Sequence, residues 1–351
     1  MNAHLRPPRQ LSATHVTLAH GGGGKAMRDL VEDVFVAAFA NPAMGEMEDQ
    51  ARLTNAALTV PGARLAFTTD AFVVDPIEFP GGDIGKIAVC GTVNDLVVGG
   101  AVPLWLSAAF IIEEGVDVAL LRRIAASMRA AADEAGVAIV TGDTKVVGRG
   151  SADKIFIATS GIGVIAPDRD LRASAVQPGD VAIVNGALGD HGAAIMIARG
   201  DMNLSTELVS DCRSLGALME ATLAAAPGLR AARDATRGGV ASALNEIAAA
   251  SGVGIEIHEA VLPLRAEARG VCEILGLDPL YLANEGTLVA FVPECEAAAA
   301  VAAMRATDAG RSAVAIGKAV VAHPGVVVMN TMLGGRRIVD MLVGDQLPRI
   351  C

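Results

Sequence analysis

The sequence predicts an α/β (α+β) protein of two domains. Its 351 residues are long for one compact domain and suit two, at roughly 150 residues per domain. In both halves, short apolar runs typical of strands alternate with longer segments of helical periodicity. Between the halves, residues 166–180 are rich in turn formers and charge, which predicts a connector.

The first half carries the predicted elements of one α/β unit. Residues 1–15 contain two prolines and no periodic pattern, so we expect a loosely held extension. The predicted strands are 65–74, 104–112, 137–143 and 155–165. The predicted helices are 25–40, 84–99 and 117–135.

The second half repeats this style. The predicted strands are 181–186, 254–259, 287–292 and 313–317. The predicted helices are 191–199, 208–225, 239–251 and 294–306. After about residue 330 the chain shows little helical pattern, and Pro348 disfavours a regular last element, so we expect a flexible tail.

Composition favours a cytoplasmic, soluble protein without nucleic-acid partners. Although 52% of the residues are hydrophobic, no uninterrupted apolar stretch reaches the roughly 18 residues of a spanning helix. The N-terminus has charge and proline where a signal peptide carries its apolar segment. The five cysteines form no CxxC pair, which argues against a zinc site or a disulfide framework. A net charge of −11 without a basic tract argues against nucleic acid, so a phosphate ligand would need local chemistry.

A glycine run, HGGGGKAM from His20 to Met27, precedes the first predicted helix. Consecutive glycines let backbone N–H groups approach an anion, and the helix N-terminus adds partial positive charge, which makes a candidate phosphate cradle. It is not a Walker A loop, because Ala26 follows Lys25 where Ser or Thr is required. Alone, such a run is also compatible with a flexible hinge.

Aspartates recur at turns and strand ends, where carboxylates can converge on a hard cation such as the Mg²⁺ that accompanies ATP. For any single aspartate taken alone, helix or turn capping is the favoured explanation. In the second half, GDHGAA and DATRGGV each place an aspartate and glycines before a helix, and we expect His191 to be a structural hydrogen-bonding residue. The first-half aspartates are Asp49, Asp70, Asp75, Asp95 and Asp143.

The last residue is the most informative single position. Cys351 follows Pro348, Arg349 and Ile350 at the chain end, where a side chain has little packing to do. A prenylation signal is excluded, because its cysteine would stand three residues earlier. The adjacent α-carboxylate is expected to raise the pKa of the thiol unless a cation compensates, and Arg349 is the nearest candidate.

Together these segments resemble the HypE family of hydrogenase maturation proteins. The resemblance rests on HGGGGKAM, EDQARL, TTDAFVVDPIEFPGGDIGKIAVCGTVNDL, FIIEEG, TGDTKVVGRG, GDHGAAIM, RDATRGGV, GLDPLYLANEG and the terminal PRIC, and it runs from about residue 17 to 351. It implies two α/β domains of the aminoimidazole-ribonucleotide synthetase type. The expected division is an extension 1–15, an ATP-binding and dimerising domain 16–168, a C-terminal domain 169–330 and a tail 331–351.

The resemblance also implies an activity: ATP-dependent dehydration of a carboxamide on Cys351 to a thiocyanate, which supplies cyanide to the iron of [NiFe]-hydrogenase. The implied partners are a second copy of the chain, the carbamoyltransferase HypF and the HypC–HypD complex. Lys145 is the implied base, and Glu285 the implied proton acceptor behind it. The implied ATP ligands are Gly22, Gly23, Gly24, Lys25, Asp49, Asp70, Asn94, Asp95, Thr141, Gly142 and Asp143, and the implied Mg²⁺ ligands are Asp49, Asp70, Asp95 and Asp234.

Two other functions remain open from the sequence. One is a small-molecule kinase or selenophosphate synthetase of the same superfamily, although the glycine segment holds His20 and lacks the thiol of a selenophosphate synthetase. The other is a non-catalytic carrier that uses Cys351 only as an attachment point, which would leave the aspartates and glycines without a purpose.

Overall fold

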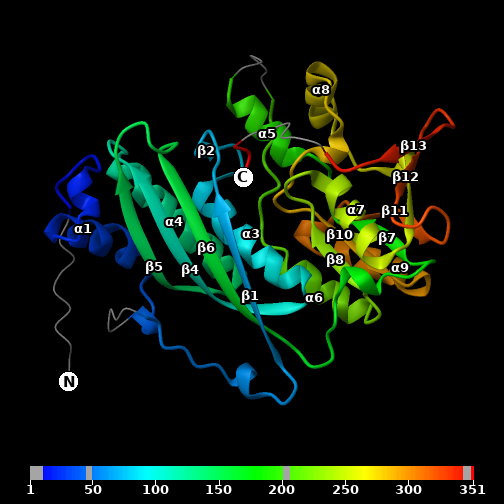
Figure 1. The fold of residues 1–351 in the computed structure, drawn as a ribbon, viewed down its shortest axis with the longest axis horizontal. Helices are drawn as coiled ribbons and strands as arrows, with labels where there is room; N and C mark the ends of the chain where they lie inside the picture. The colour runs from blue at the N-terminus through cyan, green and yellow to red at the C-terminus, as the bar shows by residue number, and fades with distance from the viewer. Residues whose placement is uncertain (1–10, 45–49, 201–205, 343–348) are drawn as a thin grey trace.

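The computed structural model describes residues 11–44, 50–200, 206–342 and 349–351. These residues form two α/β bodies side by side, each built on one main sheet (Figure 1). The predicted fold class is therefore confirmed. Among the described residues, no helix combines the length and the apolar character needed to cross a membrane.

The first body contains a four-stranded sheet in the order β1-β6-β4-β5. β4 and β5 are parallel, and the other neighbours are antiparallel. A small hairpin of β2 (Glu78–Phe79) and β3 (Gly82–Asp83) stands beside it. The sheet strands are β1 (Arg64–Phe72), β4 (Ala101–Glu113), β5 (Ala138–Val147) and β6 (Ile155–Ile165).

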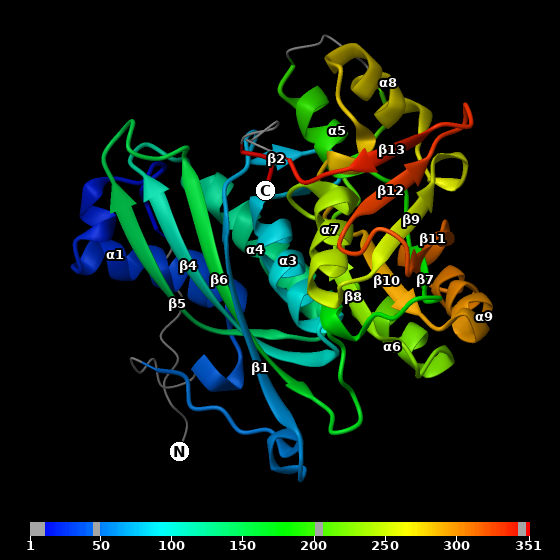
Figure 2. The ribbon, with the colours of Figure 1, turned by 45° about the vertical axis from the view of Figure 1, so that its right-hand side comes forward.

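Two helices, α3 (Ile84–Val98) and α4 (Val118–Ala135), cover the inner face of this sheet (Figure 2). α4 is amphipathic, begins at Asp117, whose side chain accepts the Ala119 N–H, and ends at Gly136 with a left-handed φ of 70°. α3 is buried on nearly all sides, because it also contacts β8 (Ala231–Asp234) and α6 (Gly216–Ala225) of the second body. Its mostly apolar sequence fits that central place.

A helical segment runs along the β5 edge of the sheet. It comprises α1 (Lys25–Leu30), a π-helical stretch η2 (Val31–Val36) and α2 (Ala37–Phe39), and it follows the short turn η1 (Leu18–Gly21) (Figure 1). Phe35 packs on Phe110 of β4 with ring centroids 4.3 Å apart. This confirms the helix predicted at 25–40.

Large apolar side chains are exposed on the outer face of the first sheet. Leu65 and Phe67 of β1 are 62% and 66% exposed, and Ile111 of β4 is 41% exposed. Side chains alternate between the two faces of a strand, so these residues point away from α3 and α4. An exposed apolar patch of this kind is typical of an interaction surface.

The second body holds a seven-stranded sheet in the order β13-β12-β9-β11-β7-β10-β8, in which only β12 and β9 are parallel. Its strands are β7 (Val181–Val184), β8 (Ala231–Asp234), β9 (Gly254–His258), β10 (Leu288–Val292), β11 (Val314–Val320), β12 (Val327–Asn330) and β13 (Arg336–Val339). Its helices are α5 (Asp190–Ala198), α6 (Gly216–Ala225), α7 (Gly239–Ser251), α8 (Ala266–Leu275) and α9 (Glu294–Arg305).

The structure corrects the sequence prediction at two places. The helix predicted at 208–225 begins only at Gly216, because residues 206–215 are irregular and their backbone N–H groups bond to other segments, as Leu215 does to Asn94. Strand β13 lies inside the predicted tail 331–351 and pairs with β12, so that stretch is not wholly irregular. Prediction also missed β8, β12 and β13, of four residues each, and α8.

Candidate active site

The last residue of the chain lies inside the protein, where the two bodies meet (Figure 1). Ile350 is only 4% exposed and packs into the main core, which carries Cys351 inward. Cys351 lines a cavity of about 40 Å³ together with Asp70, Ala71, Phe72, Gly91, Asp95, Asp234, Thr236, Arg237 and Glu285. The tail thus brings its thiol to the acidic residues of both bodies.

Glu285 is a buried carboxyl without a hydrogen-bonding partner for either oxygen among the described residues. Burial raises its pKa well above the ordinary value, repulsion from Asp211 and Asp234 adds to this, and the neighbouring Cys351 thiol acts in the opposite direction. An unpartnered buried carboxyl is costly, which is typical of a group kept for chemistry.

The loop that carries Glu285 is anchored by Asp211. One carboxylate oxygen of Asp211 accepts the Glu285 N–H at 2.9 Å, and the other accepts the Gly286 N–H and the Thr287 hydroxyl at 3.0 Å each. A side chain at position 286 would clash, because its Cβ would stand 2.0 Å from the Asp211 carbonyl oxygen. Glycine there lets the two segments approach and fixes Glu285 in place.

Asp70 of β1 and Asp95 of α3 form a close acidic pair. Asp70 accepts the Thr92 hydroxyl at 3.3 Å, and Asp95 accepts the Thr68 hydroxyl at 2.7 Å. Burial and repulsion from Asp95 raise the pKa of Asp70 to about 6. Burial, with repulsion from Asp95 and Asp70, raises the pKa of Asp234 to about 7. These shifts show that the three carboxylates share one poorly solvated region.

The metal-ligating atoms of this region decide whether it can bind Mg²⁺. Within the described ranges, no three acidic, histidine or cysteine side chains are arranged to hold a metal by themselves. Mg²⁺ bound with a nucleotide usually takes one or two carboxylates and completes its shell with phosphate and water. The Asp70–Asp95 pair fits that pattern, whereas a preformed set that includes Asp234 is not present. Asp49 lies outside the described residues.

Asn94, predicted to bind ATP, joins elements of the two bodies in this structure. Its amide NH₂ donates to the carbonyls of Arg213 and Glu285 at 3.0 and 3.4 Å, and its oxygen accepts the Leu215 N–H at 2.8 Å. The buried amide therefore joins α3 to the second body and holds no N–H free for a nucleotide.

The cation that faces Cys351 is Arg237 and not Arg349. Burial raises the pKa of the thiol well above its ordinary value, repulsion from Glu285 adds to it, and Arg237 acts against both. The Arg349 side chain instead forms an ion pair with Asp153 at 3.3 Å on the surface. The prediction that Arg349 compensates the thiol is wrong, because the Arg349 guanidinium is paired with Asp153. The backbone of Arg349 is left-handed, with φ of 55°.

The other predicted ligands gather along β5. Gly22, Gly23 and Gly24 lead into α1 at Lys25, and η1 before them packs on β5. A Cβ added at Gly23 or Gly24 would meet nothing within 4 Å, so the loop faces open space as a cradle would. Thr141, Gly142 and Asp143 lie on β5 itself.

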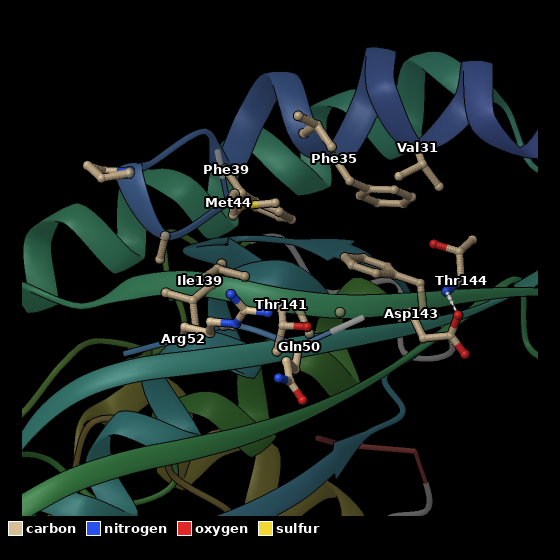
Figure 3. A pocket seen from close by; sticks show the side chains of 18 of the residues that line it. Val31, Phe35, Phe39, Met44, Gln50, Arg52, Ile139, Thr141, Asp143 and Thr144 are labelled. Atoms are coloured by element: carbon tan, nitrogen blue, oxygen red, sulfur yellow. Dashed lines mark hydrogen bonds between the residues drawn. The ribbon is translucent and has the colours of Figure 1, made fainter. Parts of the chain in front are cut away.

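A cavity of about 430 Å³ opens beside this group, between the helical segment and β5. Figure 3 shows Phe35, Phe39 and Met44 on the helical side and Ile139 and Thr141 on the strand side. Its other polar lining includes Gln50, Arg52, Asp143 and Thr144 (Figure 3). An apolar cavity with a few polar groups is the usual form of a small-molecule site.

The packing of β5 on β4 requires glycine at position 142. A Cβ there would stand 2.1 Å from the Ala108 carbonyl oxygen on β4, next to the register shift between the two strands. Glycine at this position is thus explained by strand packing, whether or not a ligand approaches.

The group around Asp70 and Cys351 and the predicted ligands on β5 lie at opposite edges of the first sheet. β6 and β4 separate β1 from β5, which amounts to about 14 Å at the usual strand spacing. Lys145 pairs in register with the exposed Ile111, so its exposed side chain points from the outer face. Within one chain, the structure therefore does not bring Lys145 or Asp143 next to Cys351.

Three tail contacts could not be found from the sequence. His191 and Arg199 of the α5 region bond to carbonyls of the tail, and Arg237 faces the thiol. The DATRGGV motif drew attention to Asp234, but nothing in its spacing indicates that Arg237 faces a residue at the chain end. His191 is a structural hydrogen-bonding residue, as predicted.

Two family profiles match the chain. Residues 53–165 match the N-terminal domain of AIR synthase related proteins, and residues 177–330 match their C-terminal domain. These ranges coincide with the two bodies described above.

Individual relatives agree over nearly the full length. The chain is 69% identical to the carbamoyl dehydratase HypE of Rhodobacter capsulatus, over 96% of this chain and 98% of that protein. It is 47% identical to a hydrogenase maturation protein HypE crystallised with ATP, with a TM-score of 0.90 over 95% and 99% of the two chains. A HypE in complex with HypF is 44% identical, with a TM-score of 0.77 over 91% and 100%.

Proposed function

The chain belongs to the HypE family of carbamoyl dehydratases, and we propose that this enzyme uses ATP to convert an S-carboxamide on its own Cys351 into a thiocyanate. The observation that carries the proposal is the Cys351 thiol in a small cavity beside the buried, unpartnered Glu285. A thiocyanate made there would supply the cyanide ligands of the [NiFe]-hydrogenase iron centre.

The chemistry suits a tail that leaves the cavity to be modified and docks there again for dehydration. HypF would place a carboxamide, H₂N–C(=O)–, on the Cys351 sulfur. The amide oxygen is a poor leaving group, so it attacks the γ-phosphorus of ATP and ADP departs. Phosphate then leaves from carbon as the nitrogen loses two protons, which gives N≡C–S–Cys351, ADP and phosphate. Each step needs a base near the nitrogen and charge neutralisation near the phosphates.

Glu285 is the group in the chain's own cavity that can take a proton from the nitrogen. Its raised pKa makes its ionised form a stronger base than an ordinary carboxylate. Asp70 and Asp95 would hold Mg²⁺, which when bound neutralises the phosphate charge. The cavity that Thr141 and Asp143 line would receive the base of ATP, and the Gly22–Lys25 loop its phosphates.

A homodimer would unite the two halves of the site. The exposed apolar face of the first sheet, with Leu65, Phe67 and Ile111, favours packing against a second copy. A two-fold axis parallel to the strands exchanges the sheet edges, so β5 of each subunit would lie over β1 of the other, at about 10 Å. Lys145 of the partner subunit would then stand near the edge that holds Asp70 and Cys351.

The register supports this arrangement. Asp143 pairs with Ala109 of β4, which pairs with Ala158 of β6, which pairs with Ala71 of β1. The two-fold rotation keeps this height along the strands, so the β5 group would face the strand that carries Asp70. Lys145 can act as the proposed base only if the chain forms this two-fold dimer.

The carrier alternative leaves the site unexplained. A protein that used Cys351 only for attachment would gain nothing from burying Glu285 without a partner or from crowding Asp70 against Asp95. We propose HypF as the transient donor of the carboxamide and the HypC–HypD complex as the acceptor of cyanide.

Intact-mass spectrometry tests the proposal. Incubation with HypF, carbamoyl phosphate and Mg-ATP should add one carboxamide and then convert it to one cyano group, located on Cys351 by peptide mapping. Cys351→Ala should bind ATP and acquire neither group. A carboxamide that persists on wild-type protein through many equivalents of ATP would refute the dehydratase assignment and favour the carrier.

A further inference from the structure

Two side chains at the ends of α5 hold the main chain of the tail, and the proposed chemistry uses neither. His191 Nε2 donates to the Ile350 carbonyl oxygen at 2.7 Å. Arg199, the C-cap residue of α5, donates from Nη2 to the Arg349 carbonyl oxygen at 2.7 Å. Successive carbonyls of the last residues are thus bound from one helix.

The ring of His191 is fixed as a donor toward the tail. A carbonyl only accepts, so Nε2 carries the hydrogen and Nδ1 of the neutral ring accepts the Ser210 hydroxyl at 2.8 Å. Ser210 is oriented in turn, because its oxygen accepts the Cys212 N–H at 3.1 Å. Phe79 packs edge-on against the ring, with centroids 5.5 Å apart. Burial lowers the pKa of His191, which keeps the ring neutral.

Arg199 joins the tail to the first body. Its Nε donates to the Asp75 carbonyl oxygen at 2.8 Å, while the Asp75 N–H donates to the same Arg349 carbonyl that Arg199 binds, at 3.2 Å. Arg349, Asp75 and Arg199 therefore form one junction of three chain segments. Undocking the tail would leave the buried His191 donor without this partner, which costs free energy.

We propose that His191 and Arg199 are positioning residues that clamp the tail main chain and so hold the Cys351 sulfur beside Glu285 during dehydration. Both contacts are to carbonyl oxygens, so the clamp fixes the register of the tail and does not depend on its side chains. The effect on turnover rests on the proposed function, whereas the effect on docking does not.

A reactivity assay measures docking without any turnover. The background is Cys295→Ala, because Cys295 is the exposed cysteine that would otherwise react. Iodoacetamide should alkylate Cys351 slowly while the tail is docked. His191→Leu and Arg199→Met each remove a side-chain donor that binds a tail carbonyl, so the alkylation rate should rise about five- to tenfold. Arg129→Met, which removes an exposed arginine of α4 whose ion-pair partner is Asp133, should leave the rate unchanged.

Rescue distinguishes positioning from general loss of structure. His191→Gln keeps an amide N–H that can reach the Ile350 carbonyl, so its alkylation rate should fall back toward that of wild type. The thermal midpoint should stay near the wild-type value in Arg199→Met, and this variant carries the test if His191→Leu does not fold. Wild-type alkylation rates in folded Arg199→Met and His191→Leu would overturn the clamp.

Turnover provides the second arm. In a single-turnover assay on protein already carrying the carboxamide, both clamp variants should form thiocyanate about five- to tenfold more slowly, with unchanged ATP affinity and unchanged carboxamide acceptance from HypF. If alkylation accelerates while even wild-type protein forms no thiocyanate, the clamp stands and the proposed function fails. Wild-type dehydration rates in both variants would overturn the positioning role.

Discussion

At the scale of single residues, the site is organised around the burial of negative charge. Glu285, Asp70 and Asp234 all have raised pKa values, first because they are buried and then because they repel one another or a neighbouring aspartate. Such a region holds protons that ordinary carboxyls would release, and it gains most from a cation or a proton donor that arrives with substrate.

Glu285→Gln tests the proton acceptor with the smallest change of shape. The amide cannot take a proton from the carboxamide nitrogen, so dehydration should slow by about 10² to 10⁴. Carboxamide acceptance from HypF should stay unchanged, because it takes place with the tail outside the cavity. Quenched-flow mass spectrometry of Cys351 measures both steps, and an unslowed dehydration would remove Glu285 from the mechanism.

The raised pKa of Asp234 predicts that the stability of the folded protein depends on pH. An aspartate in the unfolded chain has a pKa of about 3.9, and Asp234 in the folded protein has one of about 7. Between these values the folded state binds more protons than the unfolded state, so Asp234 makes the protein less stable as pH rises from about 4 to 7. Asp234→Asn should therefore gain about 2 to 4 kcal/mol over wild type between pH 4 and pH 8.

Urea unfolding at pH 4, 6 and 8 measures this difference. Asp308→Asn serves as the control, because Asp308 is an exposed surface residue. A stability difference between Asp234→Asn and wild type that stays constant across this pH range would contradict the raised pKa.

Some residues of the site could be predicted from the sequence, and others could not. Cys351, Asp70, Asp95 and Glu285 were predicted, and the structure gathers them, because each stands in a motif or at a chain end. Arg237 and the tail contacts were not predicted, since they depend on where an irregular tail docks, and no local pattern encodes that. Asn94 was named as an ATP ligand from the family resemblance, and in the structure it and its neighbour Asp95 bond to different partners.

At the scale of elements, long periodic segments were predicted well and short edge elements were not. α3, α4, β4 and β6 match their predicted ranges to within a few residues. β13 was missed because its four residues, Arg336–Val339, have two arginines and a polar approach, which resemble a loop. Its place in the sheet comes from pairing with β12, a tertiary contact.

The element that controls Glu285 is the extended segment 206–215, and Asp211 is its anchor. Asp211→Asn replaces one accepting oxygen by an NH₂ group that would face backbone N–H donors. Hydrogen bonds to a charged group contribute about 1.5 to 3 kcal/mol each, so we expect a loss of about 2 to 4 kcal/mol in the free energy of unfolding.

Denaturant unfolding measures that loss, and the rate of dehydration should fall with it because Glu285 is displaced. Glu220→Gln, an exposed partner of Arg169, is the control and should change stability by less than about 1 kcal/mol. An Asp211→Asn protein as stable as wild type would show that the loop is held by other contacts.

At the scale of the whole molecule, the width of the first sheet separates the ligand group around Asp70 from the ligand group on β5. Motif order along the chain suggested one site, and the fold divides its residues between β1 and β5. The apolar outer face offers the means of joining them, since a second copy would bring its own β5 across. Sequence patterns carry no signal for this, because the contact is between chains.

Heterodimers with one defect in each subunit decide whether Lys145 acts across the interface. Lys145→Ala and Cys351→Ala subunits, given different affinity tags, can be purified as a mixed dimer. The Lys145→Ala subunit keeps its own Cys351 and Glu285 and would receive Lys145 of the partner subunit. One complete site of two should give about half of the wild-type thiocyanate yield per dimer, whereas each homodimer should give almost none.

A second mixed dimer controls for exchange of tails. Glu285 and Cys351 meet within one chain, so Glu285→Gln paired with Cys351→Ala leaves no complete site and should stay inactive. If this pair is active, the tail enters the neighbouring subunit and the first result says nothing about Lys145. If both mixed dimers are inactive, Lys145 acts on its own chain, and the proposed two-fold arrangement loses its catalytic argument.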